Sequence, residues 1–212
     1  MASPNYDLLS VRLSRMLGDV VASASTDGKV WTSARRDILL NNAIRRWMLE
    51  EAQKENINAL KGYVTSESQS LSSNVVARST YTGGVFYIIS GYNATNSVFI
   101  DRLEEDLRLD IVNGRMPFLT PTTYQEYWSY EGANIRIYGA GATDSVTLHY
   151  VKDHTDMSAG ASSDTVVPSM YWGIVLDYAL ELGVQEKPDP EKYPIVQDKA
   201  QEKVPTNLIG DK

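Results

Sequence analysis

The sequence predicts an α+β fold in which a bundle of about four helices is interrupted by a β-rich insertion that includes an antiparallel hairpin. Three observations support this prediction. Stretches near both ends of the chain repeat apolar residues at helical spacing. The middle of the chain is rich in Ser, Thr, Gly, Val and Tyr. Within that middle part, two neighbouring stretches alternate apolar and polar residues, as strands do.

The length and the changes of pattern suggest a division of the chain. Its 212 residues suffice to bury a hydrophobic core without disulfides. Residues 1–61 and 166–203 are expected to form the helical core, and residues 62–165 the insertion. Residues 204–212 are expected to form a flexible C-terminal tail.

The first two bundle helices are expected at residues 6–17 and 32–61. Gly18 can end the first helix, because glycine readily adopts the left-handed conformation found after helices. Thr32 or Ser33 is expected to cap the second helix. One side of the second helix carries an apolar stripe of Leu40, Ala43, Ile44, Trp47 and Met48. Ile38 and Leu49 form a smaller apolar stripe on another side.

The insertion gives its clearest strand signal at VFYIIS, residues 85–90. Five further elements are expected: a weaker strand at 74–80, a helix at 99–111, a short helical turn at 120–130, and two strands at 133–139 and 144–153. We expect the last two strands to pair as the hairpin, joined by the glycine-rich turn that starts at Gly139.

The third bundle helix is expected at residues 168–184, with Pro168 in its first turn. This stretch is apolar nearly all round, so we expect it to lie between other helices or between subunits. A polar fourth helix is expected at residues 190–203. The residues expected in the helical core and interface are Trp47, Met48, Tyr171 and Trp172.

The composition limits the possible partners. The formal net charge is -7 and the pI is about 4.9, which disfavours tight binding to DNA or to an anionic membrane. The absence of cysteine excludes disulfides, thiolate metal sites and a cysteine nucleophile. No signal-peptide pattern and no apolar run of about 18 residues occurs, so we expect synthesis and assembly in the cytoplasm, without a membrane.

Common catalytic motifs are missing from the sequence, which has no GxSxG, P-loop or HExxH. GAGATD begins like a dinucleotide-binding fingerprint, but it lacks the third glycine and lies between two strands. HYVKDHTD combines His149 and His154 with Asp153 and Asp156 at a spacing that matches no specific metal site. We interpret the acidic run at 104–106 as a solvated helix face. We therefore expect no enzymatic activity and no catalytic, cofactor-binding or metal-binding residues.

Two arginine pairs, Arg35–Arg36 and Arg45–Arg46, lie on the second predicted helix. At about 100° per residue they do not form one basic stripe, and acidic residues on the same helix offset much of their charge. We therefore predict that Arg35, Arg45 and Arg46 make ion pairs to a neighbouring element or subunit. The 13 tyrosines also suit protein interfaces that remain partly wet.

The order of these elements resembles that of the head-to-tail connector proteins of tailed bacteriophages, also called portal adaptors or head-completion proteins. The resemblance rests on the long helix LLNNAIRRWMLEE, the late pair NIRIYG and SVTLHYVKD, and the helix YWGIVLDYALELG that follows Val167 and Pro168. It covers residues 8–203. The helical pattern within 98–130 departs from it, since family members often have strands there.

The resemblance implies a structural virion protein at the head-to-tail junction. Its copies would form a homo-oligomeric ring, commonly a dodecamer. The ring would bind the portal protein on one side and a tail protein or the next connector on the other. Genomic DNA would pass through without specific binding, and an acidic ring suits this role because it repels phosphate. Leu208 and Ile209 would anchor the C-terminal tail of the chain on the portal protein.

The residues expected at a subunit or partner interface are Arg35, Ile38, Arg45, Arg46, Leu49, Tyr171, Trp172, Leu208 and Ile209. Other functions stay open. The protein could be a DNA-binding accessory of phage packaging that uses Arg35, Arg36, Arg45 and Arg46, which salt-dependent DNA binding would reveal. It could be a small hydrolase that uses His149 or His154, although the sequence shows no nucleophile motif that would accompany either histidine. It could also be a mixed α/β domain of another role.

Overall fold

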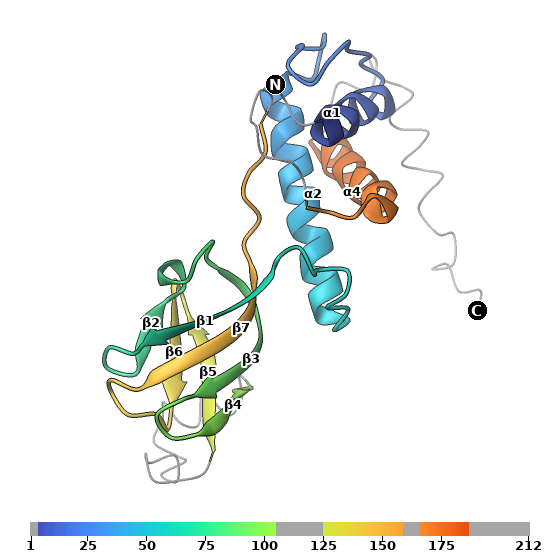
Figure 1. Cartoon of the computed structure of the whole chain (residues 1–212). Coiled ribbons are helices and arrows are strands. Elements are labelled where there is room, and N and C mark those ends of the chain that lie inside the picture. Colours follow the sequence, from blue (N-terminus) through green and yellow to red (C-terminus); the bar gives the residue numbers. More distant parts are fainter. Residues whose placement is uncertain (1–3, 105–124, 159–165, 187–212) are drawn as a thin grey trace, which may run out of the picture. The chain divides into compact units, whose positions relative to one another are not determined.

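The computed structural model describes residues 4–104, 125–158 and 166–186 (Figure 1). The chain divides into two compact units. The helical unit comprises Met1–Ala59 and Thr155–Lys212, and the sheet unit comprises Leu60–His154. The chain therefore leaves the helical unit once and later returns to it.

The predicted fold, a four-helix bundle with a β-rich insertion, is wrong. The structure is a mixed α+β fold in which the described residues form three α-helices and a seven-stranded curled sheet (Figure 1). The predicted fourth helix at 190–203 and the tail at 204–212 lie outside the described residues. The sheet has a hydrophobic core of its own, so it is a folded unit and not an elaboration of a bundle.

Three helices make up the described regular structure of the helical unit. They are α1 (Pro4–Met16), α2 (Ser33–Gln53) and α4 (Trp172–Gln185), and a short 3₁₀ turn, η2 (Ser169–Tyr171), leads into α4. Within the described residues no helix is both long enough and apolar enough to cross a lipid bilayer.

Two predicted helix boundaries are confirmed. The side-chain hydroxyl of Thr32 accepts the N–H of Arg35 and so caps α2. Gly18 follows α1 with a φ of 78°, in the left-handed region. The N–H of Asp19 then donates to the carbonyl of Ser14 at 2.8 Å, which closes the end of the helix.

The prediction that the second helix extends to residue 61 is wrong, because α2 ends at Gln53. Glu55 has a φ of 57°, and the N–H of Asn56 donates to the carbonyl of Glu51 at 2.9 Å. This is the hydrogen-bond pattern of a helix end that usually carries glycine. Because this position is occupied by a glutamate, the sequence does not indicate that the helix ends here.

One face of each helix forms the core of the helical unit. Gly183 on α4 permits close packing, since a Cβ at this position would lie 2.9 Å from Cδ2 of Leu17. Removal of these apolar side chains from water is the main stabilising contribution. The buried apolar residues of the three helices include Leu9, Leu13, Leu39, Leu40, Ala43, Ile44, Trp47, Met48, Val175, Ala179 and Leu180.

The described residues of the sheet unit form seven strands whose spatial order is β1-β7-β3-β4-β5-β6-β2. Only β4 and β5 pair in parallel, and the other neighbours are antiparallel. The strands are β1 (Val64–Ser70), β2 (Val75–Ala77), β3 (Val85–Asn93), β4 (Val98–Arg102), β5 (Glu126–Glu131), β6 (Asn134–Tyr138) and β7 (Ser145–Lys152). The strand expected at 85–90 is thus confirmed as β3.

The predicted hairpin between residues 133–139 and 144–153 is wrong. Both strands form, as β6 and β7, but they do not pair with each other. β6 pairs with β5 and β2, whereas β7 pairs with β1 and β3. An alternating pattern identifies a half-buried strand but carries no information about its partner.

Two helical predictions in the insertion are also wrong. Val98–Arg102 is strand β4, where a helix at 99–111 was expected. Phe99 is exposed and Ile100 is buried, as on the two faces of a strand, and Leu103, which the helical repeat grouped with Phe99, is buried. The helical turn expected at 120–130 is also contradicted, because Glu126–Glu131 is strand β5. Residues 105–124 lie outside the described part.

The sheet unit has a hydrophobic core of its own. Tyr81 and Tyr150 pack edge to face there, with ring centroids 5.3 Å apart. The core residues are Leu71, Val76, Tyr81, Val85, Ile88, Ile100, Trp128, Ile135, Ile137, Ala140, Val146, Leu148 and Tyr150. They come from β2 to β7 and from the segments between strands, whereas β1 contributes none of them.

Candidate assembly surface

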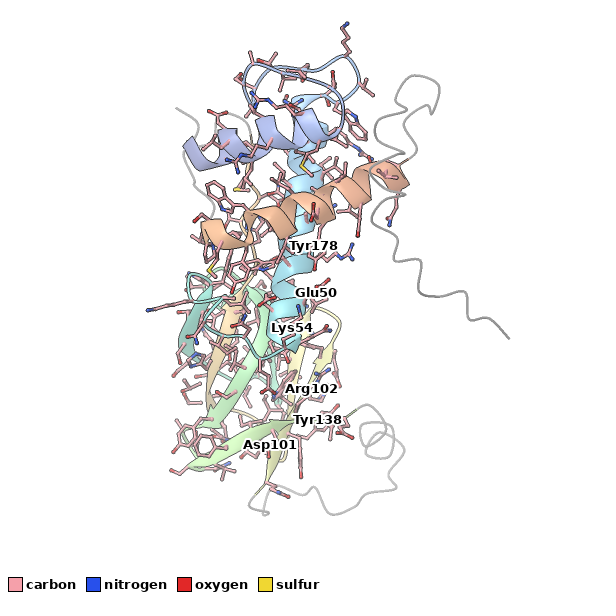
Figure 2. All side chains as sticks on the ribbon, turned by 90° about the vertical axis from the view of Figure 1, so that its right-hand side faces the viewer. Glu50, Lys54, Asp101, Arg102, Tyr138 and Tyr178 are labelled. Atoms are coloured by element: carbon pink, nitrogen blue, oxygen red, sulfur yellow. The ribbon has the colours of Figure 1, made fainter. Side chains whose placement is uncertain are left out.

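Arg46 on α2 contacts two residues of α4. Its Nη1 lies 2.6 Å from Oε2 of Glu181, and its guanidinium lies 4.3 Å from the centre of the Tyr178 ring. Tyr178 donates a hydrogen bond to Glu50, which also pairs with Arg46 at 3.4 Å. Figure 2 labels Glu50 on α2 and Tyr178 on α4, which meet here. These four residues, the Arg46 cluster, link α2 to α4.

The protonation states in the Arg46 cluster favour this link. Burial, followed by the hydrogen bond to Glu50, raises the pKa of Tyr178 to about 12, so its hydroxyl remains a donor at neutral pH. The hydrogen bond to Glu181 raises the pKa of Arg46 above its usual value. The side chains of Arg46 and Glu181 are about half exposed, so solvent screening limits their ion pair to about 1 kcal/mol or less.

Arg35 and Arg45 also pair with other segments of the helical unit. Arg35 Nη2 lies 2.7 Å from Oε1 of Glu186, just beyond the end of α4. Arg45 Nη1 lies 2.7 Å from Oδ1 of Asp156, in the segment that returns from the sheet unit. Three of the four arginines on α2 therefore pair with acids of other elements in the same chain. Whether they also contact another subunit stays a prediction.

Arg36 differs from its neighbours because it is completely buried. Its Nη1 donates to the carbonyl of Trp31 at 2.6 Å, and its Nη2 donates to the carbonyls of Ala24 and Thr26 at 2.9 and 2.7 Å. Its Nε donates to Ser10 at 3.2 Å. Arg36 thus holds the loop between α1 and α2, and its guanidinium is not available to bind DNA. The sequence contains nothing that separates Arg36 from Arg35.

The same loop is held by Asp19, which the sequence analysis did not single out. Its carboxylate accepts the N–H groups of Lys29, Val30 and Trp31 at 2.9 to 3.0 Å. Burial opposes ionisation, but these three hydrogen bonds, with the charge of Arg36, hold the pKa of Asp19 below its ordinary value. Asp19 and Arg36 together give the loop a defined shape.

The outward side of α2 carries a narrow apolar strip. Ile38 and Leu49, both predicted as interface residues, are 46% and 43% exposed. Asn42 is exposed and lies between them at helical spacing. Covering such a strip with another surface is favourable, because it removes the isoleucine and leucine side chains from water. The strip is a candidate contact for another protein surface.

The described residues of the chain cover α4 only in part. Of its 14 residues, the buried ones are Val175, Leu176, Ala179, Leu180 and Gly183. Ile174 is 41% exposed, and Trp172, Leu182 and Val184 are half-buried. An apolar helix in a soluble protein normally buries most of its apolar side chains. The outer side of α4 therefore has the composition of a contact surface.

Tyr171 and Trp172, which were predicted at the interface, are half-buried at the start of α4. The ring of Tyr171 lies 5.2 Å from that of buried Trp47, centroid to centroid. Trp172 donates its indole N–H to the carbonyl of Val167 at 3.1 Å. Both residues thus help to hold the helical unit and still expose part of their rings. Leu208 and Ile209 lie outside the described residues.

The sheet unit contains a buried polar cluster that sequence reasoning missed. Nδ2 of Asn93 donates to both carboxylate oxygens of Glu126 at 2.9 Å and to Asp144 at 2.7 Å. Nδ2 of Asn96 donates to the same two carboxylates at 2.8 Å. Their amide donors satisfy the two acids and link the end of β3 to β5 and to the turn before β7. Only the folded sheet brings these distant residues together.

The two histidines do not form a common site. His154 is buried and its Nδ1 lies 3.2 Å from the hydroxyl of Tyr63, whereas His149 is exposed on β7. In the described ranges, no three His, Asp or Glu side chains are grouped as metal ligands. The glycine-rich segment from Gly139 to Asp144 connects β6 to β7, but it is not the expected hairpin turn, because these two strands do not pair. Asp144 accepts the N–H of Gly141 within it.

Comparison with known proteins does not identify a family for this chain. No protein-family model matches the sequence, and no curated protein matches it significantly.

Proposed function

We propose that the protein is a structural virion component, a head-to-tail connector whose copies form a ring between the portal and the tail. The observation that carries this proposal is the apolar outer side of α4, which the described chain leaves partly uncovered. A subunit of a ring must bury one face internally and further faces against its neighbours. The exposed strip of Ile38 and Leu49 on α2 fits the same requirement.

The arrangement of charges supports a conduit for DNA more than a DNA-binding surface. The chain carries a net charge of -7, and every copy in a ring adds to it. Arg35, Arg45 and Arg46 pair with acids, and Arg36 is buried. A protein that grips DNA needs cationic groups free to contact phosphate. These observations speak against the packaging accessory as the alternative function.

The element order α1, α2, strands and α4 is also consistent with the resemblance to connector proteins, although the sheet is larger than expected. The proposed partners are the portal protein on one side and a tail protein or the next connector on the other. Leu208 and Ile209 would anchor the C-terminal tail on the portal. The protein would act in the virion without catalysis and without a cofactor.

Electron microscopy of the purified protein, alone and mixed with the portal protein of the same virus, tests this function. We expect closed rings that stack coaxially on the portal. Particles of single copies that never associate with the portal would overturn the proposal. A parallel measurement of DNA binding at low and high salt should show no salt-dependent affinity, whereas such affinity would favour the packaging accessory.

A further inference from the structure

The two edge strands of the described sheet, β1 and β2, differ in how much free backbone they present. On β2, the N–H of Val75 donates to the carbonyl of Ser72 at 3.1 Å, and the N–H of Ser72 donates back to Val75 at 2.9 Å. The hydroxyl of Thr80 donates to the carbonyl of Ala77. The short edge of β2 is therefore largely occupied by bonds within its own chain.

The edge of β1 consists of three serines. The N–H of Leu71, just after β1, donates to the carbonyl of Asp144, just before β7, at 2.9 Å. In an antiparallel pair every second residue faces the partner strand, so Ser66, Ser68 and Ser70 direct their backbone N–H and C=O groups away from β7. All three residues are exposed. In the described ranges, no backbone hydrogen bond joins them to a segment on that side.

The usual features that prevent strand addition are missing from the edge of β1. The strand contains no Lys, Arg or Pro, and its register with β7 runs without a bulge. Its one acid, Glu67, is held by its own chain, because its carboxylate accepts the N–H of Thr82 at 2.8 Å and the hydroxyl of Tyr150 at 3.2 Å. The small serine side chains leave room for another strand. The edge of β1 is therefore open to strand pairing.

We propose that the β1 edges of two copies of this chain pair in antiparallel fashion, with a two-fold axis at Ser68. This register sets Ser66 opposite the partner's Ser70, so the free backbone groups of all three serines bond across the contact. It also sets Glu67 opposite the partner's Gln69, whose amide is a hydrogen-bond donor. A register centred on Glu67 would place two carboxylates opposite each other, which is unfavourable. The strand is thus complementary to itself in one register.

This contact goes beyond the proposed ring. A ring about a single axis contains only head-to-tail contacts, whereas the pairing of two β1 edges uses the same surface on both copies. The β1 contact therefore lies outside the ring. It joins two free copies, or two whole rings, through their sheet units.

Single cysteines test the contact and its register, because the chain has no cysteine of its own. Ser68→Cys places two thiols on opposite residues whose Cα atoms are about 5.5 Å apart, within reach of a disulfide. Ser66→Cys is the matched control, since its two thiols lie four residues out of register, about 14 Å apart. After oxidation, a non-reducing gel should show at least about tenfold more covalent dimer for Ser68→Cys than for Ser66→Cys.

Proline at the same position removes a backbone donor that only the partner copy uses. Ser68→Pro spares the pairing with β7, because the N–H of Ser68 faces the free edge. Ser68→Ala is the control, since it also loses the hydroxyl that lies 2.6 Å from Oγ1 of Thr147 but keeps the N–H. Sedimentation velocity without the portal protein should give half the wild-type mass for Ser68→Pro and the full mass for Ser68→Ala. If circular dichroism shows Ser68→Pro to be unfolded, Ser66→Pro replaces it.

The outcomes separate the β1 contact from the ring. Equal cross-linking of the two cysteine variants, or a folded proline variant with the wild-type mass, would overturn the β1 contact. The folded proline variant should still form rings on the portal protein. A wild type that forms no ring on the portal protein would contradict the ring, and the selective Ser68→Cys disulfide would still support the β1 contact.

Discussion

Nη1 of Arg46 and Oε2 of Glu181 lie 2.6 Å apart, and this ion pair joins α2 to α4. The Tyr178 ring lies under the same guanidinium, and Glu50 accepts from both Arg46 and Tyr178. The helical unit thus uses an arginine that is conspicuous in the sequence to hold two helices together.

Replacement of Glu181 tests the strength of the Arg46 cluster. Glu181→Gln removes the charge but keeps the size of the side chain. We expect a loss of about 1 kcal/mol or less in the free energy of unfolding, because both partners are about half exposed. Urea denaturation measures this loss, which should shrink at high salt. A loss several times larger would mean that the pair is effectively shielded from solvent.

Replacement of Arg36 should have a much larger effect. Arg36→Met leaves the buried carbonyls of Ala24, Thr26 and Trp31 without their donor. We expect a loss of about 3 kcal/mol or more in the free energy of unfolding. Arg35→Met is the matched control and should cost about 1 kcal/mol or less, since Arg35 is exposed. Equal effects of the two substitutions would contradict the buried role of Arg36.

Asp19 should make stability depend on acid pH. Its pKa in the folded protein is lower than its ordinary value of 3.8, so the ionised form is favoured by folding. The resulting stability is fully present above the unfolded pKa and is lost as the pH falls through the folded pKa. Thermal midpoints of the wild type and of Asp19→Asn should therefore differ near neutral pH and converge below about pH 4. A constant difference across this range would contradict the role of the charge.

Removal of the C-terminal tail tests its proposed contact with the portal. A chain that ends after Val204 lacks Leu208 and Ile209. We expect the circular dichroism spectrum and the thermal midpoint to stay unchanged, since the two cores seen in the described residues are built from residues that precede this position. Binding to the portal, measured by surface plasmon resonance, should weaken. Substitution of Leu208 and Ile209 by Ser in the full chain is the finer test, and unchanged affinity in both cases would refute the tail contact.

Local features of the fold could be predicted where a short segment determines them. Thr32 caps α2 through its own hydroxyl, and Gly18 ends α1 because its φ is positive. Both effects act within one turn of helix, so the sequence around them suffices. The end of α2 could not be predicted, because Glu55 adopts a conformation that glutamate seldom takes.

Strand partners could not be predicted, because they depend on residues far apart in the chain. β6 and β7 are neighbours in sequence, yet β2 and β5 flank β6 in the sheet. The cluster in which Asn93 donates to Glu126 and Asp144 could not be predicted for the same reason, because its residues are far apart in the sequence. The four-residue spacing of Phe99 and Leu103 predicted one face of a helix, but Phe99 is exposed on β4 and Leu103 is buried after its end.

The candidate surface was partly foreseeable from helical periodicity. That Ile38 and Leu49 lie away from the main stripe of α2 follows from the 100° rotation per residue, and both are exposed. The burial of Arg36 has no such signature, because it depends on the loop that Asp19 shapes.

The native mass of the protein, alone and mixed with the portal protein of the same virus, tests the central claim most directly. One chain has a mass of 23.6 kDa. The account predicts a complex with the portal that contains a fixed multiple of this mass, as a closed ring requires. A mass of 23.6 kDa under all conditions, with no association with the portal, would contradict it.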